Sequence, residues 1–374
     1  MKLSFIFGTR PEAIKLAPLI LYFKNKGTHE INVCVTAQHR QMLDQVLEIF
    51  EITPDVDLNL MKPNQSLSEL TANAINSLNT YFTSYKPDAV FVQGDTTTVF
   101  AASLVAFYHK VKVIHVEAGL RTNNKYSPFP EEINRQLTSK LTDLHLAPTQ
   151  KSYDNLVKEG IPKETIFITG NTVIDALFMV KNKAEKINKI NGLDDNLLSS
   201  DKKIVLITGH RRENFGEGFQ NICKAIKILS EKFSEHHFIY PVHLNPNVQK
   251  PVYEILGNSK NIHLIEPQTY LPFIKLMLRS DIILTDSGGV QEEAPSLGKP
   301  VLVMRENTER PEAVEAGTVK LVGINIEKIV SEATLLLTDK NAYDKMARAI
   351  NPYGDGKACE RIYDIVSNNL AQTV

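Results

Sequence analysis

Short runs of consecutive apolar residues recur along the chain, and each is followed by a glycine-bearing turn and a helical stretch. The run Leu3–Phe7 passes through the turn Gly8-Thr-Arg-Pro11 into a helix predicted over residues 12–24. Runs of the same kind follow at residues 31–36, 89–92 and 113–116. Continuous apolar runs of this length, alternating with helices, are typical of parallel strands covered on both faces. The first part of the chain therefore predicts a doubly wound α/β domain.

The pattern begins again after a polar stretch over residues 181–203. A strand at 204–208 leads through the turn Gly209-His-Arg-Arg212 into a helix, and later strands are predicted at 238–242, 263–265, 281–285 and 301–304. Because 374 residues are enough for two domains or more, the sequence predicts two doubly wound α/β domains in tandem. We expect them over residues 1–169 and 170–356, with a C-terminal helix at about 357–374 that packs back on the first domain.

The charge balance excludes partners that need a strong electrostatic field. The chain carries 42 Lys and Arg against 43 Asp and Glu, a net charge of −1, which favours neither nucleic acid nor an anionic membrane. No apolar run approaches the roughly 20 residues that span a bilayer, and the chain begins directly with a predicted strand, which leaves no room for a signal peptide. We therefore expect a cytoplasmic protein without nucleic-acid or membrane partners.

Metals and redox cofactors are not expected either. Cys34, Cys223 and Cys359 lie far apart, so no pair has the spacing of metal ligands, and an odd count does not make a disulfide framework. No pair of histidines has the His-Glu-x-x-His spacing of a zinc site. The turn after the first strand is not the Gly-x-Gly-x-x-Gly fingerprint of nicotinamide sites.

The strongest local signal is a glycine-rich turn between a strand and a helix, Asp286-Ser287-Gly288-Gly289. Two glycines let the backbone approach a ligand, and free amides at a helix start favour a phosphate. An ordinary strand-to-helix connection explains the turn equally well. A serine-protease nucleophile is set aside, because that fold is all-β and bears disulfides. Glu293, one turn further on, would suit a ribose diol behind a bound phosphate.

Three carboxylates stand at or near the ends of predicted strands or at helix starts: Asp95, Glu117 and Glu131. In an open α/β sheet the carboxyl ends of the strands line the binding crevice. Asp95 is also explained as a helix N-cap, and Glu131 as a partner of the helix dipole. Glu117 is flanked by Val116 and Ala118-Gly119, so we expect it to be partly buried and suited to proton transfer.

Several cations and one aromatic residue could serve the same crevice. Arg10 can reach a phosphate from the first turn, where Pro11 begins a helix, and Lys15 lies near the same end. His210 is either a proton carrier or phosphate contact, or a histidine satisfied within its turn. Arg310 is a further loop cation. Phe273 is either a core residue or a platform for a base, and for a lone phenylalanine the core is the more common place.

Taken together, these motifs resemble the non-hydrolysing UDP-N-acetylglucosamine 2-epimerases, which share the GT-B fold with many glycosyltransferases. The matching segments cover essentially the whole chain. They include Phe7-Gly-Thr-Arg-Pro-Glu-Ala-Ile-Lys15, Gly94-Asp-Thr-Thr97, Glu117-Ala-Gly-Leu-Arg121, Pro128-Phe-Pro-Glu-Glu132, Thr169-Gly-Asn-Thr172, Gly209-His-Arg-Arg-Glu-Asn214, Pro241-Val-His-Leu-Asn-Pro246, Asp286-Ser-Gly-Gly-Val-Gln-Glu-Glu-Ala-Pro295 and Thr308-Glu-Arg-Pro311. The resemblance implies two Rossmann-like domains whose parallel sheets face each other across a cleft.

The resemblance also implies roles for individual residues. The catalytic set it implies is Asp95, Glu117, Glu131 and His210, and the diphosphate contacts it implies are Arg10, His210, Ser287, Gly288 and Gly289. It assigns Glu293 to the ribose and Phe273 to the uracil region. Lys15, Arg135 and Arg310 complete the substrate-binding set.

Some family members carry a second, activating UDP-N-acetylglucosamine. The positions in this chain that match that second site are Gln38, Gln41, Arg211 and His243. The resemblance further implies a homodimer and no cofactor.

The chemistry explains why such a site needs these groups. The hydrogen on C2 of the sugar is not next to a carbonyl, so direct deprotonation is out of reach. If UDP leaves C1 first, the developing positive charge acidifies the C2 proton, and its loss gives 2-acetamidoglucal. Re-addition of UDP with protonation on the opposite face yields UDP-N-acetylmannosamine, a precursor of cell-surface polysaccharide. Cations and amides must hold the diphosphate, and carboxylates must move the proton.

Three other functions remain open on the sequence. A GT-B glycosyltransferase would share the nucleotide site but would leave the C2 proton in place. A hydrolysing 2-epimerase would release free N-acetylmannosamine and UDP. A nucleotide-sugar sensor would bind the ligand without turnover.

Overall fold

The computed structural model describes residues 1–37, 40–62, 65–194 and 196–371, and the chain divides into two units. Unit 1 is Met1–Met179 together with the C-terminal segment that begins at Tyr353, and unit 2 is Val180–Pro352. The boundary falls within helix α7 (Thr172–Glu185), so it lies later than residue 169. The reason is that Asp175 of this helix accepts hydrogen bonds from the amides of Ala358 and Cys359, at 3.2 and 2.9 Å.

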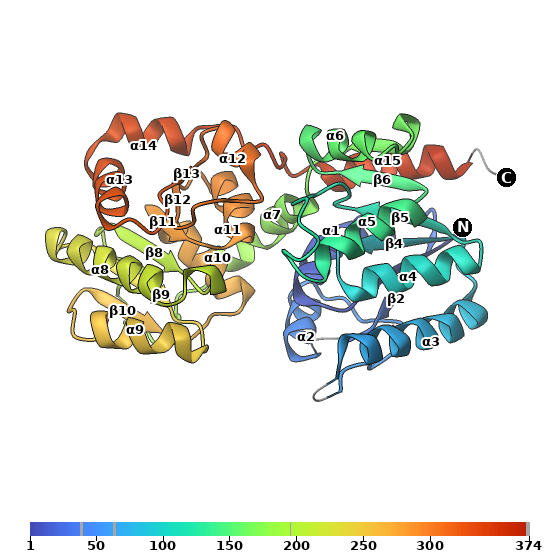
Figure 1. Cartoon of the computed structure of the whole chain (residues 1–374), viewed down its shortest axis with the longest axis horizontal. Helices are drawn as coiled ribbons and strands as arrows, with labels where there is room; N and C mark the ends of the chain where they lie inside the picture. The colour runs from blue at the N-terminus through green and yellow to red at the C-terminus, as the bar shows by residue number, and fades with distance from the viewer. Residues whose placement is uncertain (38–39, 63–64, 195, 372–374) are drawn as a thin grey trace. The chain divides into compact units, whose positions relative to one another are not determined.

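Among the described residues, unit 1 holds a seven-stranded sheet in the order β3-β2-β1-β4-β5-β6-β7, and all its pairs are parallel. Figure 1 labels β2, β4, β5 and β6 of this sheet. The strand order reverses between β1 and β4, which is where ligands bind in open α/β sheets. The strands are β1 (Lys2–Phe7), β2 (Glu30–Val35), β3 (Val56–Asp57), β4 (Ala89–Gln93), β5 (Lys112–Val116), β6 (Leu144–Ala147) and β7 (Ile166–Ile168).

Helices cover this sheet, and the first of them shows why its boundaries fall where they do. Pro11 opens α1, Glu12 completes a capping box with Thr9, and Gly27 ends the helix in the left-handed conformation. The C-terminal helix α15 packs on α1, with the Tyr363 ring 5.0 Å from that of Phe23. The helices of unit 1 are α1 (Arg10–Lys26), α2 (Arg40–Ile49), α3 (Leu67–Tyr85), α4 (Thr97–Tyr108), α5 (Glu131–Leu141), α6 (Gln150–Lys158), α7 (Thr172–Glu185, which runs on into unit 2) and α15 (Ala358–Ala371).

Unit 2 repeats the plan with a six-stranded sheet in the order β10-β9-β8-β11-β12-β13, again parallel throughout the described residues. Here the order reverses between β8 and β11. Two parallel, doubly wound sheets confirm the fold class predicted from the sequence. The strands are β8 (Ile204–Thr208), β9 (His237–Pro241), β10 (Ile262–Ile265), β11 (Ile282–Thr285), β12 (Val301–Val303) and β13 (Val319–Leu321).

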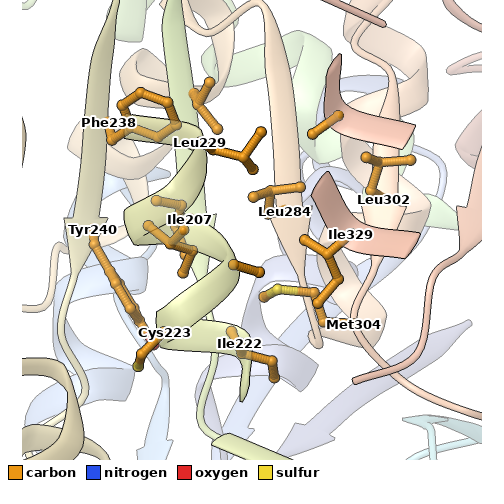
Figure 2. Packing of buried hydrophobic residues seen from close by; sticks show 14 of the residues in the cluster. Ile207, Ile222, Cys223, Leu229, Phe238, Tyr240, Leu284, Leu302, Met304 and Ile329 are labelled. Carbon is orange, nitrogen blue, oxygen red and sulfur yellow. The ribbon is translucent and has the colours of Figure 1, made fainter. Parts of the chain in front are cut away.

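The core of unit 2 lies between this sheet and helices α8 and α13. Figure 2 shows Ile222, Cys223 and Leu229 of α8 and Ile329 of α13 beside strand residues such as Leu284, and all belong to one buried cluster. The helices of this unit are α8 (Glu217–Lys232), α9 (Pro246–Leu256), α10 (Tyr270–Arg279), α11 (Gly288–Glu293), α12 (Pro311–Glu315), α13 (Ile326–Thr338) and α14 (Lys340–Ala347). No helix in the described part of the chain combines the length and apolar character that a membrane crossing requires.

Candidate active site

A buried carboxylate ties together the two loops at the switch point of unit 1. Glu12 accepts hydrogen bonds from the amides of Gly8 (3.0 Å) and Thr9 (2.7 Å) and from the Thr96 hydroxyl (2.7 Å). Burial raises the pKa of Glu12, and these hydrogen bonds oppose the rise. The loop after β1, which leads into Arg10 at the start of α1, and the loop after β4, which carries Asp95, are therefore held in one arrangement.

Glu117 follows β5 in a constrained stretch of backbone. Its φ is +64°, which is uncommon for a residue with a side chain. Gly119, at φ +95°, lies against the Ser152 carbonyl, where any Cβ would collide. The Glu117 side chain is 11% exposed, forms an ion pair with Lys15, and accepts a hydrogen bond from Asn171 Nδ2 at 2.8 Å. The carboxylate is thus nearly buried, as expected from the sequence, and it is paired.

Asp95 is held from helix α5. Arg135 Nη2 lies 2.5 Å from Asp95 Oδ2, and Asn134 Nδ2 donates to the Asp95 carbonyl at 3.0 Å. Arg135 is buried and its Nη1 lies 3.3 Å from Glu132 Oε2, so one guanidinium serves two carboxylates. Charge-assisted pairs of this kind fix geometry as well as charge.

His115 holds the loop in front of Asp95. Its Nε2 donates to the Gly94 carbonyl at 2.7 Å, while its buried Nδ1 has no hydrogen-bond partner among the described residues. Burial lowers the pKa of His115 to about 3. The imidazole is therefore neutral over the whole physiological pH range, and it stabilises the loop through its hydrogen bond to the Gly94 carbonyl.

The two glutamates that begin α5 differ. Glu132 is fully buried and accepts the amides of Thr122 and Asn123, each at 3.0 Å, which anchors the loop before the helix. Glu131 is half-buried and has no hydrogen bond or ion pair within the described part of the chain. Arg10 is also half-buried and equally unpaired there. Both side chains are thus left available for a ligand.

In unit 2 a buried carboxylate again fixes the switch point. Asp286 is fully buried, and its Oδ2 accepts the amides of His210 and Arg211, each at 2.8 Å. Asp286 therefore builds the turn and does not face a ligand with that oxygen. His210 stacks on His243 with ring centroids 5.1 Å apart, and its Nδ1 lies 3.7 Å from Asp286 Oδ1. Loss of water contact lowers the pKa of His210, and the Asp286 charge opposes this.

The glycine-rich turn is open at one glycine and covered at the other. A Cβ on Gly288 would stand 3.0 Å from Arg310 Cζ, because that guanidinium lies beside the turn. Arg310 is held there by Glu292, whose Oε1 lies 2.8 Å from its Nη2. A Cβ on Gly289 would come no closer than 3.9 Å to its surroundings among the described residues. The backbone is thus approachable at Gly289, with a cation close by.

The residues predicted for the nucleoside lie on or against α10. Tyr270 donates its hydroxyl hydrogen bond to Glu293 Oε1 at 2.8 Å, so this carboxylate has a fixed orientation. Phe273, on the same helix, is only partly buried, whereas Ile274, Leu276 and Met277 are fully buried. Part of the Phe273 side chain is therefore accessible, as a platform for a base requires.

The positions matched to a second ligand site are distributed over both units. Gln41 is exposed on α2 of unit 1, and Gln38 lies outside the described residues. In unit 2 Arg211 has a buried Nε without a hydrogen-bond partner among the described residues. His243 is exposed, and its Nδ1 accepts from the Asn245 amide at 3.1 Å.

Sequence reasoning missed three residues that orient the predicted ones: Asn171, His115 and Tyr270. Asn171 stands inside a motif noted in the sequence, Thr169–Thr172, but its partner is 54 positions away. No group of three or more His, Cys, Asp or Glu side chains in the described ranges could hold a metal ion.

Comparisons with known proteins point in one direction. The family profile described as UDP-N-acetylglucosamine 2-epimerase matches residues 22–367. A UDP-N-acetylglucosamine 2-epimerase from Yersinia pestis is 56% identical, with 99% of each chain covered. The crystal structure of UDP-GlcNAc 2-epimerase from Neisseria meningitidis bound to UDP-GlcNAc is 54% identical, covers 99% of this chain and 100% of its own, and has a TM-score of 0.89. A glycosyltransferase from Streptomyces nogalater shares the fold at 14% identity, with a TM-score of 0.62 and 98% and 99% of the two chains covered.

Proposed function

The chain belongs to the UDP-N-acetylglucosamine 2-epimerase family, and we propose that it inverts C2 of the sugar by eliminating UDP and adding it back. The resemblance drawn from the motifs is confirmed, and so is the GT-B-like fold. The protein is an enzyme that epimerises UDP-N-acetylglucosamine at C2. We further propose which residues transfer the proton and which bind UDP.

The observation that carries the mechanism is the pair of fixed carboxylates after adjacent parallel strands. Asp95 follows β4 and Glu117 follows β5, and each is paired with a cation, Arg135 and Lys15 respectively. Elimination breaks the C1–O bond to UDP, moves the C2 proton to a carboxylate, and leaves the electron pair in the C1=C2 bond of 2-acetamidoglucal. Return of a proton from a group on the other face, with re-addition of UDP, gives the epimer. Glu131, half-buried and unpaired among the described residues, is the third acid of this set.

Unit 2 is proposed to hold the UDP that leaves and returns. The amides of Ser287, Gly288 and Gly289 favour the diphosphate because they start a helix, and Arg310 adds charge beside them. His210 is proposed both to contact the diphosphate and to assist proton movement. Glu293, fixed by Tyr270, suits the ribose hydroxyls, and the half-buried Phe273 ring suits the uracil. Arg10 of unit 1 is proposed to contact the same diphosphate.

A second UDP-N-acetylglucosamine is proposed as an activator. Its ligands in this proposal are Gln38, Gln41, Arg211 and His243. The buried Nε of Arg211, which has no hydrogen-bond partner within the described ranges, supports an anionic ligand at this position.

A homodimer and a cytoplasmic setting are further parts of the proposal. Large apolar side chains are exposed at the end of α4, where Phe107 is 60% and Tyr108 65% exposed, and on α5, where Leu137 is 45% exposed. Since α4 and α5 pack together, this surface favours association with a second copy. All three cysteines are buried free thiols, which suits a reducing compartment. The product, an activated N-acetylmannosamine, suits polysaccharide synthesis.

Incubation of the enzyme with UDP-N-acetylglucosamine in deuterated water tests the mechanism. The expected outcome, measured by NMR and mass spectrometry, is a mixture of the two epimers with deuterium at C2. Free N-acetylmannosamine and UDP would indicate the hydrolysing reaction. An epimer without deuterium would contradict proton exchange at C2. An unchanged sugar would point instead to a glycosyltransferase that lacks its acceptor, or to a sensor.

A further inference from the structure

Asn171 is a buried residue whose polar atoms are all directed by neighbours. It is 3% exposed and stands directly before α7. Its Oδ1 accepts a hydrogen bond from the Val173 amide at 3.0 Å, and its backbone amide donates to the Tyr353 carbonyl at 2.7 Å. Because Oδ1 faces an amide donor, Nδ2 must be the atom that faces Glu117, at 2.8 Å from Oε2. The orientation of the side-chain amide is therefore set by the fold.

Both donors to the Glu117 carboxylate use the same oxygen. Lys15 Nζ and Asn171 Nδ2 both contact Oε2. Oε1 has no hydrogen bond or ion pair with the part of the chain that the structure describes. The two oxygens are thus chemically different before any substrate is bound.

The backbone beneath Glu117 supports the same arrangement. A non-glycine residue at φ +64° persists only where its surroundings fix it, and such positions cluster at functional sites. Gly119, at φ +95° against the Ser152 carbonyl, allows the chain to make this turn. Strand β5, Lys15, Asn171 and α6 together hold one carboxylate in one orientation.

From these contacts we infer that Asn171 is a positioning residue for catalysis: with Lys15 it binds Oε2 of Glu117, so that Oε1 is the atom that exchanges the proton at C2. The inference rests on the proposed role of Glu117. In the elimination the proton passes from C2 to Oε1 while the C2–H electron pair forms the C1=C2 bond and UDP departs. In the reverse direction Oε1 returns the proton. Asn171 keeps Oε2 from rotating into that place.

The serine variant Asn171→Ser tests this, because serine can still cap α7 but has no amide donor. We expect kcat to fall about 10- to 100-fold, as for a misplaced catalytic group, with KM changed by no more than about 2-fold. The limb of the kcat–pH profile that reports the base should move to higher pH, because the charged form of Glu117 loses a hydrogen bond. Asn171→Asp, which keeps the cap acceptor but adds a like charge beside Glu117, should move the limb further and lower kcat more.

A matched control separates positioning from helix capping. Asn325 caps α13 in unit 2, where its Oδ1 accepts from the Lys328 amide at 2.8 Å. Asn325→Ser should alter stability to a similar extent and leave kcat and its pH profile at wild-type values. A wild-type kcat and pH profile in Asn171→Ser would overturn the inference, as would an equal loss of kcat in Asn325→Ser.

The role of Glu117 itself is tested separately by Glu117→Gln. If this variant loses C2 exchange while Asn171→Ser behaves as wild type, only the positioning role of Asn171 is wrong. If Glu117→Gln keeps wild-type exchange, the proposed catalytic role of Glu117 is wrong, and the inference falls with it.

Discussion

Both units fix a loop at the switch point of the sheet with a buried carboxylate, but the charged side chains near that loop differ between them. In each, a buried carboxylate at the switch point accepts two backbone amides of a loop that follows a strand: Glu12 in unit 1 and Asp286 in unit 2. Glu12 comes from the helix that follows the loop, and Asp286 from the end of the neighbouring strand. The carboxylate fixes the loop backbone in both cases.

The charged pairs near the two switch points differ in character. In unit 1 Asp95 is more exposed than its partner Arg135, whereas Glu117 and its partner Lys15 are equally buried. In unit 2 Arg310 stands beside the turn and its partner Glu292 is the more buried one. A shared scaffold can therefore present proton-transfer groups in one unit and anion-binding groups in the other. The comparison predicts that turnover depends on unit 1 and UDP affinity on unit 2.

The largest effect should come from removing the acids of unit 1. Asp95→Asn and Glu117→Gln should each lower C2 exchange by about 10²- to 10⁴-fold, because general acid–base catalysis is lost. UDP affinity, measured by calorimetry, should stay within about 2-fold. Wild-type exchange in both variants would contradict the division of labour.

Acid should destabilise unit 1 through His115. Its pKa of about 3 lies below the ordinary 6.5, so the folded chain excludes a proton that the unfolded chain binds. The stability it contributes is fully present above pH 6.5 and falls by up to about 1.4 kcal/mol per pH unit between 6.5 and 3.

The substitution His115→Gln should flatten this decline in denaturant titrations. Circular dichroism suits the measurement because the chain has no tryptophan. His237→Gln in unit 2 is the control. Its pKa is also lowered by burial, but the residue is partly exposed, so its effect should be smaller. An acid limb as steep in His115→Gln as in the wild type would contradict the prediction.

Arg10 tests whether unit 2 alone sets the affinity for UDP, because it is a unit 1 residue proposed to bind the diphosphate. Arg10→Gln should weaken UDP binding about 10- to 100-fold, the worth of one charge-assisted hydrogen bond. The melting temperature should hardly change, since Arg10 has no polar partner among the described residues. If the UDP affinity of Arg10→Gln is unchanged, Arg10 does not contact the diphosphate and nucleotide binding depends on unit 2 alone.

The smallest effect is expected at the turn itself. Gly289→Ala should weaken UDP binding about 10-fold, the equivalent of one perturbed hydrogen bond, without loss of stability, because the new Cβ comes no closer than 3.9 Å to the described residues. The matched variant Gly288→Ala should also displace Arg310, whose Cζ would be 3.0 Å away. Equal UDP affinity of Gly289→Ala and the wild type would show that the ligand does not approach this backbone.

Much of the fold could be predicted from the sequence, and the omissions have physical causes. The strands predicted from apolar runs are all present, with ends shifted by a residue or two. Strands β3, β6 and β13 were not predicted; each has only two to four residues, and His145 stands within β6. That ring is tolerated inside because its Nε2 donates to the Ser139 carbonyl at 2.9 Å. No local pattern reveals such a partner.

The kinds of residue in the site, and the strands after which they lie, could be predicted from the local sequence. They are the acids after β4 and β5, the glycine-rich turn after β11 and the cations on neighbouring loops. These follow from local rules, since apolar runs, turns and helix starts depend on neighbours in the chain. The pairing of the groups comes from the three-dimensional fold alone. Arg135 and Asp95 are 40 positions apart, Asn171 and Glu117 are 54 apart, and Lys15 and Glu117 are 102 apart. Strand order and helix packing bring these atoms within hydrogen-bond distance, and hydrogen bonding depends on distance in space.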